Sequence, residues 1–254
     1  MLIEKIIEAA TPALEKRTIK DLIVGLTLIA CELDNGAVGI SYVLREGLPH
    51  GCSRYPWIKE LIGAPALQAM DLAIQGTDNI QRGIANSVLN AASQQLVYPN
   101  QDSKGVFGLD LMPEDRVAMI GYIGGLAKQI TATTDQLIIF DKGLSEDGEQ
   151  PFLSPMDRQT DLIPTCNIVL ISGTAIINNS IDGLLALSSR AKEVVIMGPS
   201  TPMFPDGYQD TPVTRLAGAY WQKGHKAEIF RTVSLAGGHK AIDQFMVKKL
   251  VSID

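Results

Sequence analysis

The chain has 254 residues, 46% of them hydrophobic, which suits a globular protein with two domains or one large α/β domain. Its formal net charge is -6, and its 22 lysines and arginines are spread along the chain, which argues against a nucleic-acid partner. The cysteines at positions 31, 52 and 166 show no CxxC spacing, which argues against a disulfide framework or a zinc knuckle.

These features predict a protein of a reducing compartment, and we expect it to be cytoplasmic. The first segment, MLIEKIIEAATPALEKR, is an amphipathic helix in pattern and lacks the basic start and apolar core of a signal peptide. No apolar run reaches the roughly 18 residues expected of a membrane span. We therefore expect no membrane partner, and Cys31 and Cys166, which lie in strand patterns, are expected in the core.

A hairpin signal follows the first helix. Asn35-Gly36 lies between two apolar, β-rich runs, and this dipeptide is a strong indicator of a tight turn between antiparallel strands. Two helical patterns come next, at residues 57–74 and 77–96, and Thr77 or Asp78 is the expected N-cap of the second. Residues 1–98 therefore predict a small α+β domain.

The pattern changes after a stretch rich in Pro, Gly, Asn and Asp that begins at Tyr98 and reads as a linker. Apolar runs then alternate with helical stretches, which predicts a parallel sheet covered on both faces. The runs are residues 117–120, 137–140, 168–171 and 194–197, with a weaker fifth at 213–219. Residues 99–254 therefore predict a Rossmann-like α/β domain.

Ligands of such sheets bind beyond the carboxyl ends of the strands, so the residues after each strand are the candidate site. Gly121 ends the first run, and Gly124 and Gly125 open the next helix, where backbone N–H groups favour an anion. The spacing is G-x-x-G-G and departs from the G-x-G-x-x-G fingerprint. Asp141 ends the second run, where an acid can bind ribose hydroxyls. The glycines are equally compatible with a tight turn, and Asp141 with the start of a loop.

The third and fourth runs end in glycines and hydroxyl or amide side chains, which are compatible with a ligand wall as well as with helix caps and ordinary turns. The candidates at these two strand ends are Gly173, Thr174, Asn178, Gly198, Ser200 and Thr201.

The strand-end motifs EDRVAMIGYIGG, ISGTAIINNSIDGLL and VVIMGPSTPMFP, with GISYVL and RGIANSVLNA in the first half, resemble a known family. The chain is similar to the "putative heavy-metal chelation" family over nearly its whole length. The resemblance implies an enolase N-terminal-like domain followed by a Rossmann-like domain, with a cleft between them as the site. The family's description also implies a metal.

Metal ligands are sparse in this sequence, which has neither a CxxC nor an HxxxH motif. The candidates are His50 and Cys52, in the loop LPHGCSRYPW, and His239, which follows two glycines in LAGGHKAID. Each is also compatible with a surface loop or a helix cap. Because polar strand ends occur here without a ligand cluster, we hypothesise that any metal arrives already held by a small organic ligand.

Two functions follow from the resemblance and from these residues. One is the binding of a metal or metal complex in the cleft, without turnover. The other is a nucleotide- or S-adenosylmethionine-dependent enzyme that uses the glycine turn, with an adenosine-type ligand near Asp141. The sequence has no G-x-S-x-G elbow and no G-x-x-x-x-G-K-[ST] loop, which argues against a serine hydrolase or a P-loop NTPase. Whether there is catalysis is left open, and a homodimer is one assembly that the composition allows.

Overall fold

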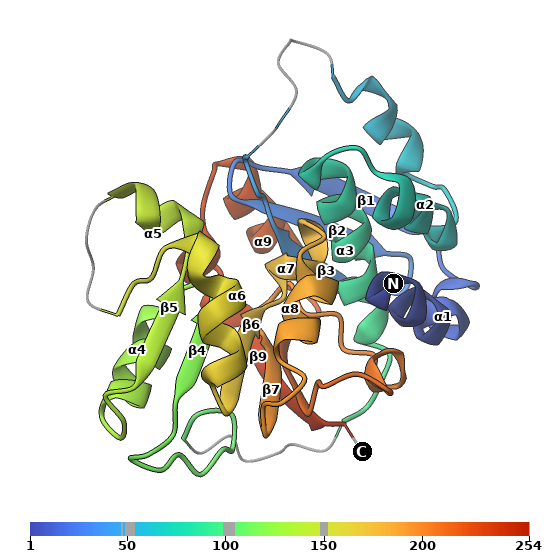
Figure 1. Ribbon diagram of the computed structural model, residues 1–254. Coiled ribbons are helices and arrows are strands. Elements are labelled where there is room, and N and C mark those ends of the chain that lie inside the picture. Colours follow the sequence, from blue (N-terminus) through green and yellow to red (C-terminus); the bar gives the residue numbers. More distant parts are fainter. Residues whose placement is uncertain (47, 49–53, 99–104, 148–151, 254) are drawn as a thin grey trace.

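The computed structural model describes residues 1–46, 48, 54–98, 105–147 and 152–253. This part of the chain forms a three-stranded antiparallel sheet and a six-stranded, mostly parallel sheet (Figure 1). The strands are β1 Ile19–Val24, β2 Leu28–Leu33, β3 Val38–Tyr42, β4 Val117–Ile120, β5 Leu137–Phe140, β6 Ile168–Ser172, β7 Glu193–Met197, β8 Arg215–Trp221 and β9 Met246–Ser252.

Helices connect and cover these strands. The α-helices are α1 Leu2–Leu14, α2 Met70–Gln75, α3 Asn79–Ser93, α4 Gly124–Thr131, α5 Lys142–Asp147, α6 Gln159–Leu162, α7 Thr174–Ile177, α8 Ile181–Leu187 and α9 Lys226–Ser234. The 3-10 helices are η1 Pro56–Leu61, η2 Ala66–Ala69, η3 Met156–Arg158, η4 Ile163–Thr165, η5 Pro205–Tyr208, η6 His239–Ala241 and η7 Asp243–Phe245. None of the helices in the described ranges is long and apolar enough to cross a membrane.

The first sheet contains the hairpin predicted from Asn35-Gly36. β2 and β3 pair antiparallel around this turn, where Gly36 has a φ of 76° that favours glycine. The side chain of Asn35 accepts a hydrogen bond of 3.1 Å from the backbone N–H of Ala37. The predicted hairpin is confirmed, and β1, which we did not predict, adds a third strand beside β2.

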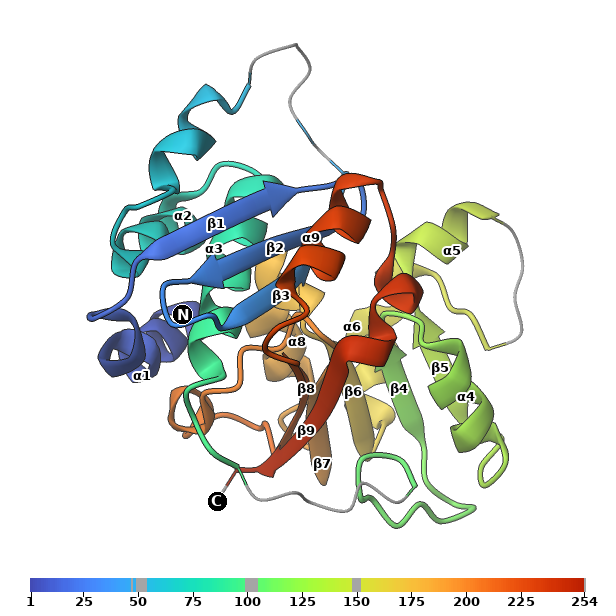
Figure 2. The same cartoon turned by 180° about the vertical axis from the view of Figure 1, so that it is seen from behind.

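β2 is buried along its whole length because both faces of the first sheet are covered. Ile29 and Cys31 pack in the core that α1 and α3 share, whereas Leu28 and Ala30 face α9, a helix from the last part of the chain. Figure 2 shows α9 lying across β1 and β2. The C-terminal half thus contributes a helix to the N-terminal sheet, and Cys31 is buried in the core as expected.

An ion-pair network joins α9 to this sheet. The Lys226 ammonium contacts Asp21 and lies 3.6 Å from a carboxylate oxygen of Glu32, whose other oxygen lies 3.0 Å from Lys20. Only 8% of the Glu32 side chain is exposed. Because a buried carboxylate is costly without partners, Lys226 both fixes α9 and stabilises that charge.

The helices of the first half match the sequence in part. α3 begins after Asp78, whose carboxylate accepts two backbone N–H groups of the first turn, so the predicted N-cap is confirmed. The single helix predicted over residues 57–74 is wrong, since η1, η2 and α2 occupy that stretch. The chain breaks there because Gly63 has a φ of 85° and Pro65 lacks a backbone N–H.

The second sheet has the strand order β5-β4-β6-β7-β8-β9, in which the first five strands are parallel and β9 is antiparallel. The four apolar runs correspond to β4, β5, β6 and β7, and the weaker fifth run corresponds to β8. The predicted α/β class, a small α+β unit before a mostly parallel sheet, is confirmed. The antiparallel edge strand β9 was not predicted.

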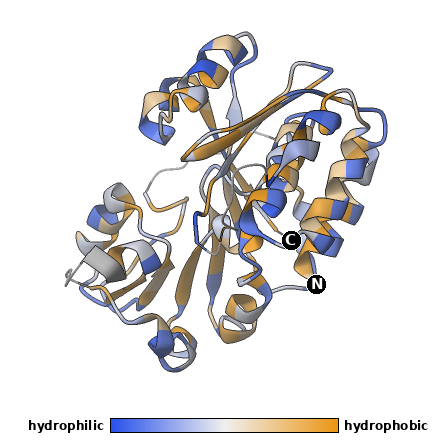
Figure 3. Cartoon of the chain, turned by 90° about the horizontal axis from the view of Figure 1, so that it is seen from above, coloured by the Kyte–Doolittle hydropathy of each residue, from blue (hydrophilic) through white to orange (hydrophobic). Residues whose placement is uncertain are grey.

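The two faces of the second sheet are covered differently. α7 and α8 pack on the face seen in Figure 1, together with elements of the first half. α4 and the segment around Val106 and Leu109 cover the opposite face, seen in Figure 2. The strands of both sheets are mainly apolar, as their orange colour in Figure 3 shows, and Cys166 is buried next to β6, as predicted.

Candidate functional site

A cavity of about 480 Å³ lies on the α4 face of the second sheet, where β8 and β9 extend beyond the cover that α4 provides. We call it the β9 pocket. It brings together three residues predicted as site residues, each from a different segment: Gly125, Gly198 and His239. The full lining is Gly105, Phe107, Ile123, Gly125, Leu126, Gln129, Gly198, Pro199, Ala217, Gly218, Ala219, His239, Asp243, Met246, Lys248, Lys249 and Leu250.

The floor of the β9 pocket follows from the register of the last two strands. Ala217 pairs with Leu250 and Ala219 pairs with Lys248, so these alternate positions share one face of the sheet. The two alanines leave space above β8 that larger side chains would fill. Lys248 is exposed at this edge and lines the cavity. The result is an apolar floor with a cation beside it.

His239 stands where the two halves of the molecule meet. It follows Gly238 at the start of η6, and its ring centroid lies 6.5 Å from that of Tyr42 and 6.2 Å from that of Trp221. Tyr42 belongs to β3 of the first sheet and Trp221 to β8 of the second. His239 Nε2 lies 3.3 Å from the sulfur of Met246. Aromatic rings and a thioether therefore surround the imidazole.

These surroundings keep the imidazole uncharged near neutral pH. Burial lowers the pKa of His239 from its usual 6.5, Lys248 adds to this effect, and Asp243 opposes it. A neutral imidazole is the form that binds metal ions. The same residue can therefore act as a ligand without first losing a proton.

Residues for a complete metal site are absent from the described part of the chain, which contains no group of three or more His, Cys, Asp or Glu side chains placed to hold an ion. In the β9 pocket His239 and Met246 offer one nitrogen and one sulfur donor. His50 and Cys52 lie outside the described residues. The pair in the pocket fits a metal only if further ligands come with it.

The glycines after β4 have separate roles. Gly121 has a φ of 89°, and a Cβ there would lie 2.7 Å from the Cβ of Ser172, so both the turn and the packing require glycine. Gly124 lines a smaller cavity of about 350 Å³ between α4 and β5. Gly125 lines the β9 pocket, where a Cβ would meet no atom within 4 Å. The turn therefore does not gather its glycines around one cavity.

Asp141 connects two backbone segments. One carboxylate oxygen accepts the N–H of Tyr122 at 2.7 Å, and the other accepts the N–H of Leu144 at 3.1 Å. The first bond holds the turn after β4, and the second lies in the first turn of α5. The geometry thus shows the predicted residue at the strand end, with both oxygens in structural contacts.

The loop after β7 forms part of the joint between the two sheets. Ser200 Oγ accepts the N–H of Tyr42 at 3.0 Å, and its carbonyl accepts the amide of Asn86 from α3 at 3.0 Å. A Cβ on Gly173 would lie 2.7 Å from the carbonyl of Ser200 and from the nitrogen of Thr201. Ser200 and Thr201 are buried, so this loop contacts protein rather than solvent.

The remaining candidates at the end of β6 contact their neighbours. Thr174 Oγ1 lies 2.9 Å from the hydroxyl of Ser172. Asn178 Oδ1 accepts the backbone N–H of Ser180 at 3.1 Å and its hydroxyl at 2.7 Å, just before α8. The Asn178 contacts stabilise the entry to α8, as expected for polar residues before a helix, whereas the Thr174 contact lies at the start of α7.

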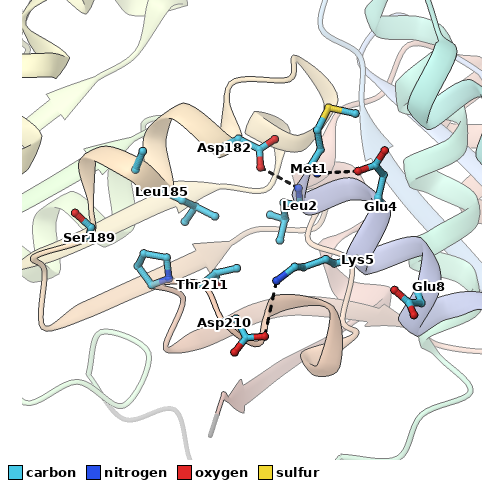
Figure 4. A pocket seen from close by; sticks show the side chains of 12 residues that line it. Met1, Leu2, Glu4, Lys5, Glu8, Asp182, Leu185, Ser189, Asp210 and Thr211 are labelled. Atoms are coloured by element: carbon cyan, nitrogen blue, oxygen red, sulfur yellow. Dashed lines mark hydrogen bonds and ion pairs between the residues drawn. The ribbon is translucent and has the colours of Figure 1, made fainter.

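A larger hollow of about 580 Å³ lies between α1, α8 and the segment after η5 (Figure 4). Asp182 accepts the N–H of Leu2 at 2.8 Å, and the Lys5 ammonium lies 3.9 Å from Asp210. These two contacts join α1 to α8 and to the segment after η5. It contains none of the residues predicted as site residues.

Four residues near this site were not predicted: Met246 and Lys248, which line the β9 pocket, and Tyr42 and Trp221, which contact the His239 ring. A signal for two of them exists in the segment MVKKLVS, where Met246, Lys248 and Leu250 alternate with residues of the other face. If this segment is taken as a strand, Lys248 and Met246 lie on the same face of the sheet.

The fold and the pocket define an α/β protein with a mostly parallel sheet, a smaller antiparallel sheet and a cavity of small-molecule size near the carboxyl ends of β7 and β8. Two family models, both described as "Putative heavy-metal chelation", match residues 7–93 and 106–252, and the chain belongs to this family. The resemblance seen in the sequence motifs is therefore confirmed.

Solved structures of the same family share the fold. A protein of unknown function from Pyrococcus horikoshii has a TM-score of 0.81 and 21% identity, covering 100% of both chains. One of unknown function from Desulfitobacterium hafniense has a TM-score of 0.79 and 18% identity, covering 98% of both chains. An uncharacterised protein of Methanocaldococcus jannaschii is 22% identical over 145 residues, which are 55% of this chain and 54% of that protein, about half its length.

Proposed function

We propose that the protein binds a metal together with a small anionic organic ligand, and that the β9 pocket is the binding site. The observation that carries this proposal is the pair of donors His239 and Met246 beside Lys248, without a third side-chain ligand in the described part of the chain. Such a site suits a metal whose other ligands belong to the bound molecule.

The size of the pocket supports an organic ligand. A volume of about 480 Å³ falls within the roughly 300–1,000 Å³ typical of small-molecule sites, and it far exceeds the space that a bare ion needs. Apolar side chains such as Phe107, Leu126 and Leu250 form much of the wall, as in most ligand pockets. A chelate with a carbon framework would bury apolar surface against them.

Lys248 offers a cation to an anionic ligand of the pocket. It lines the cavity on the same face of β9 as Met246 and Leu250, together with Asp243. Lys249 occupies the alternate position, and its ammonium lies 5.6 Å from the ring centroid of Tyr220, which packs in the core of the opposite face. A carboxylate of a metal chelate is a suitable partner for the Lys248 ammonium.

The enzyme hypothesis draws less support from the geometry. A nucleotide or S-adenosylmethionine on the turn after β4 needs Asp141 for its ribose, and both oxygens of Asp141 already accept backbone N–H groups. Binding there would have to replace those bonds. We therefore propose a binding protein that sequesters or carries its ligand. Its site is formed by residues of the predicted domain 99–254, and the predicted domain 1–98 contributes Tyr42, which stacks on His239.

Native mass spectrometry with elemental analysis on freshly purified protein tests this function. We expect an organic mass and a metal in equal amounts, with lower occupancy in Lys248→Gln. Removing one of two opposite charges about 4 Å apart in water costs about 1 kcal/mol of binding free energy, which lowers affinity roughly fivefold. Lys192→Gln, a matched change of an exposed residue next to β7, should have no effect. One metal per chain in protein free of organic ligand would contradict the proposal.

A further inference from the structure

The two donor atoms of the β9 pocket are spaced for one metal ion. His239 Nε2 and Met246 Sδ lie 3.3 Å apart. A first-row ion bound to nitrogen at about 2.0–2.1 Å and to sulfur at about 2.3 Å, with a near-tetrahedral angle, would separate the donors by roughly 3.5 Å. The observed spacing therefore needs only a small opening to admit an ion. In its absence the contact acts as a weak hydrogen bond or a packing contact.

The chemistry of this pair selects among metals. Thioether sulfur is a soft ligand that binds Cu(I) well and also occurs as a weaker ligand of Cu(II), and imidazole suits copper as well. Hard ions such as Mg²⁺ and Ca²⁺ prefer oxygen donors and would gain little from Met246. Copper is the metal that both donors serve well.

We propose that His239 Nε2 and Met246 Sδ bind the metal of the captured complex directly, and that this metal is copper. The inference rests on the proposed function, because two side chains leave coordination positions that the organic ligand must fill. Direct coordination would select for the metal of the complex, which charge recognition by Lys248 cannot do. A complex with open positions should bind more tightly than a saturated complex of similar charge.

The surroundings of the pair are suited to this role. Trp221 is buried, and its ring meets the His239 ring edge-on, at an interplanar angle of 74°, while Tyr42 stacks on the same imidazole at 27°. These rings fix the orientation of the imidazole. Both donors are half-buried, which limits the access of competing water.

Two synthetic complexes test the inference with tag-free protein. Copper(II) nitrilotriacetate is anionic and leaves coordination positions open, whereas cobalt(III) ethylenediaminetetraacetate is anionic, inert and saturated. We expect the copper complex to bind at least tenfold more tightly by calorimetry. Its electron paramagnetic resonance spectrum should gain coupling to one imidazole nitrogen, which His239→Gln removes and His225→Gln retains.

Met246→Leu tests the sulfur separately, because this change conserves side-chain volume and should leave the fold intact. We expect it to weaken the copper complex about five- to tenfold and to alter its spectrum, while Met112→Leu, at an exposed methionine, changes neither. Repeating the titration in a His50→Gln, Cys52→Ser background excludes those two residues as the source of the signal.

The outcomes separate this inference from the proposed function. Equal binding of both complexes, weakened by Lys248→Gln but not by Met246→Leu or His239→Gln, would overturn direct coordination and leave anion recognition standing. Binding of neither complex would overturn both. If substitutions of Met246 and His239 weaken copper binding but Lys248→Gln does not, direct coordination by the two donors would stand and recognition of an organic anion would be overturned.

Discussion

Replacement of Asp141 by alanine distinguishes a structural carboxylate from a ligand-binding one. In the structure its oxygens accept the N–H groups of Tyr122 at 2.7 Å and Leu144 at 3.1 Å. Alanine removes both bonds, so the turn after β4 and the first turn of α5 lose their connection. If this connection is the main role of Asp141, stability should fall even without a ligand.

The expected cost follows from the type of bond. Replacing an Asp that caps a helix by Ala costs about 0.5–2 kcal/mol. A second charge-assisted bond to a backbone N–H adds roughly 1 kcal/mol here, because the Tyr122 contact is exposed to solvent. The sum is about 1.5–3 kcal/mol. For a chain of this size that corresponds to a melting temperature lower by roughly 3–12 °C.

Urea denaturation of the wild type, Asp141→Ala and Asp141→Asn measures this cost. Asparagine keeps one acceptor oxygen and should lose about half as much stability as alanine. Affinity for the β9 pocket ligand should stay within twofold in both variants. An Asp141→Ala protein of unchanged stability that no longer binds an adenosine-type ligand would refute this reasoning and restore the enzyme hypothesis.

Three further changes test packing and charge. Gly173→Ala should cost about 1–3 kcal/mol of unfolding free energy, because its Cβ would meet backbone atoms at 2.7 Å. In the control Gly183→Ala, in α8, the Cβ meets nothing within 4 Å, so thermal melts should show neutral or higher stability. Burial raises the pKa of Tyr220 above its usual 10.0, so the unfolded chain loses that proton first and the free energy of unfolding should decline above about pH 10. Denaturation midpoints measured between pH 8 and pH 11 should show a smaller decline in Tyr220→Phe. Lys226→Met leaves the buried Glu32 with one cation fewer and should cost about 1–3 kcal/mol in urea denaturation, and an unchanged midpoint would show that the network contributes nothing.

Strands that are buried on both faces could be predicted from the sequence because their apolar runs are continuous. β4 and β5 coincide with the predicted runs, and the hairpin follows from Asn35-Gly36. β9 escaped prediction because its two consecutive lysines interrupt the apolar residues, and the run is too short to distinguish from a helix turn. The helix predicted over residues 57–74 failed because apolar spacing outweighed the breaks at Gly63 and Pro65.

Only some residues of the candidate site could be predicted from the sequence. Gly198 follows a strand, and ligands of parallel sheets bind beyond strand ends, so its position on the β9 pocket agrees with the rule. Gly173 and Ser200 satisfy the same pattern, yet they pack against each other and against α3, because the first sheet covers that edge. The sequence alone does not show which strand ends of the second sheet are covered by the first sheet. The aromatic partners of His239 come from strands almost two hundred residues apart, which no local pattern connects.

The position of α9 also has a consequence for synthesis on the ribosome. The face of β2 formed by Leu28 and Ala30 stays without its cover until about 190 further residues have been made, roughly 10–40 s at 5–20 residues per second. During that interval an apolar surface of the nascent chain is open to chaperones and to other chains. Completion of the C-terminal half, rather than of the N-terminal half, is therefore the step that closes the first sheet.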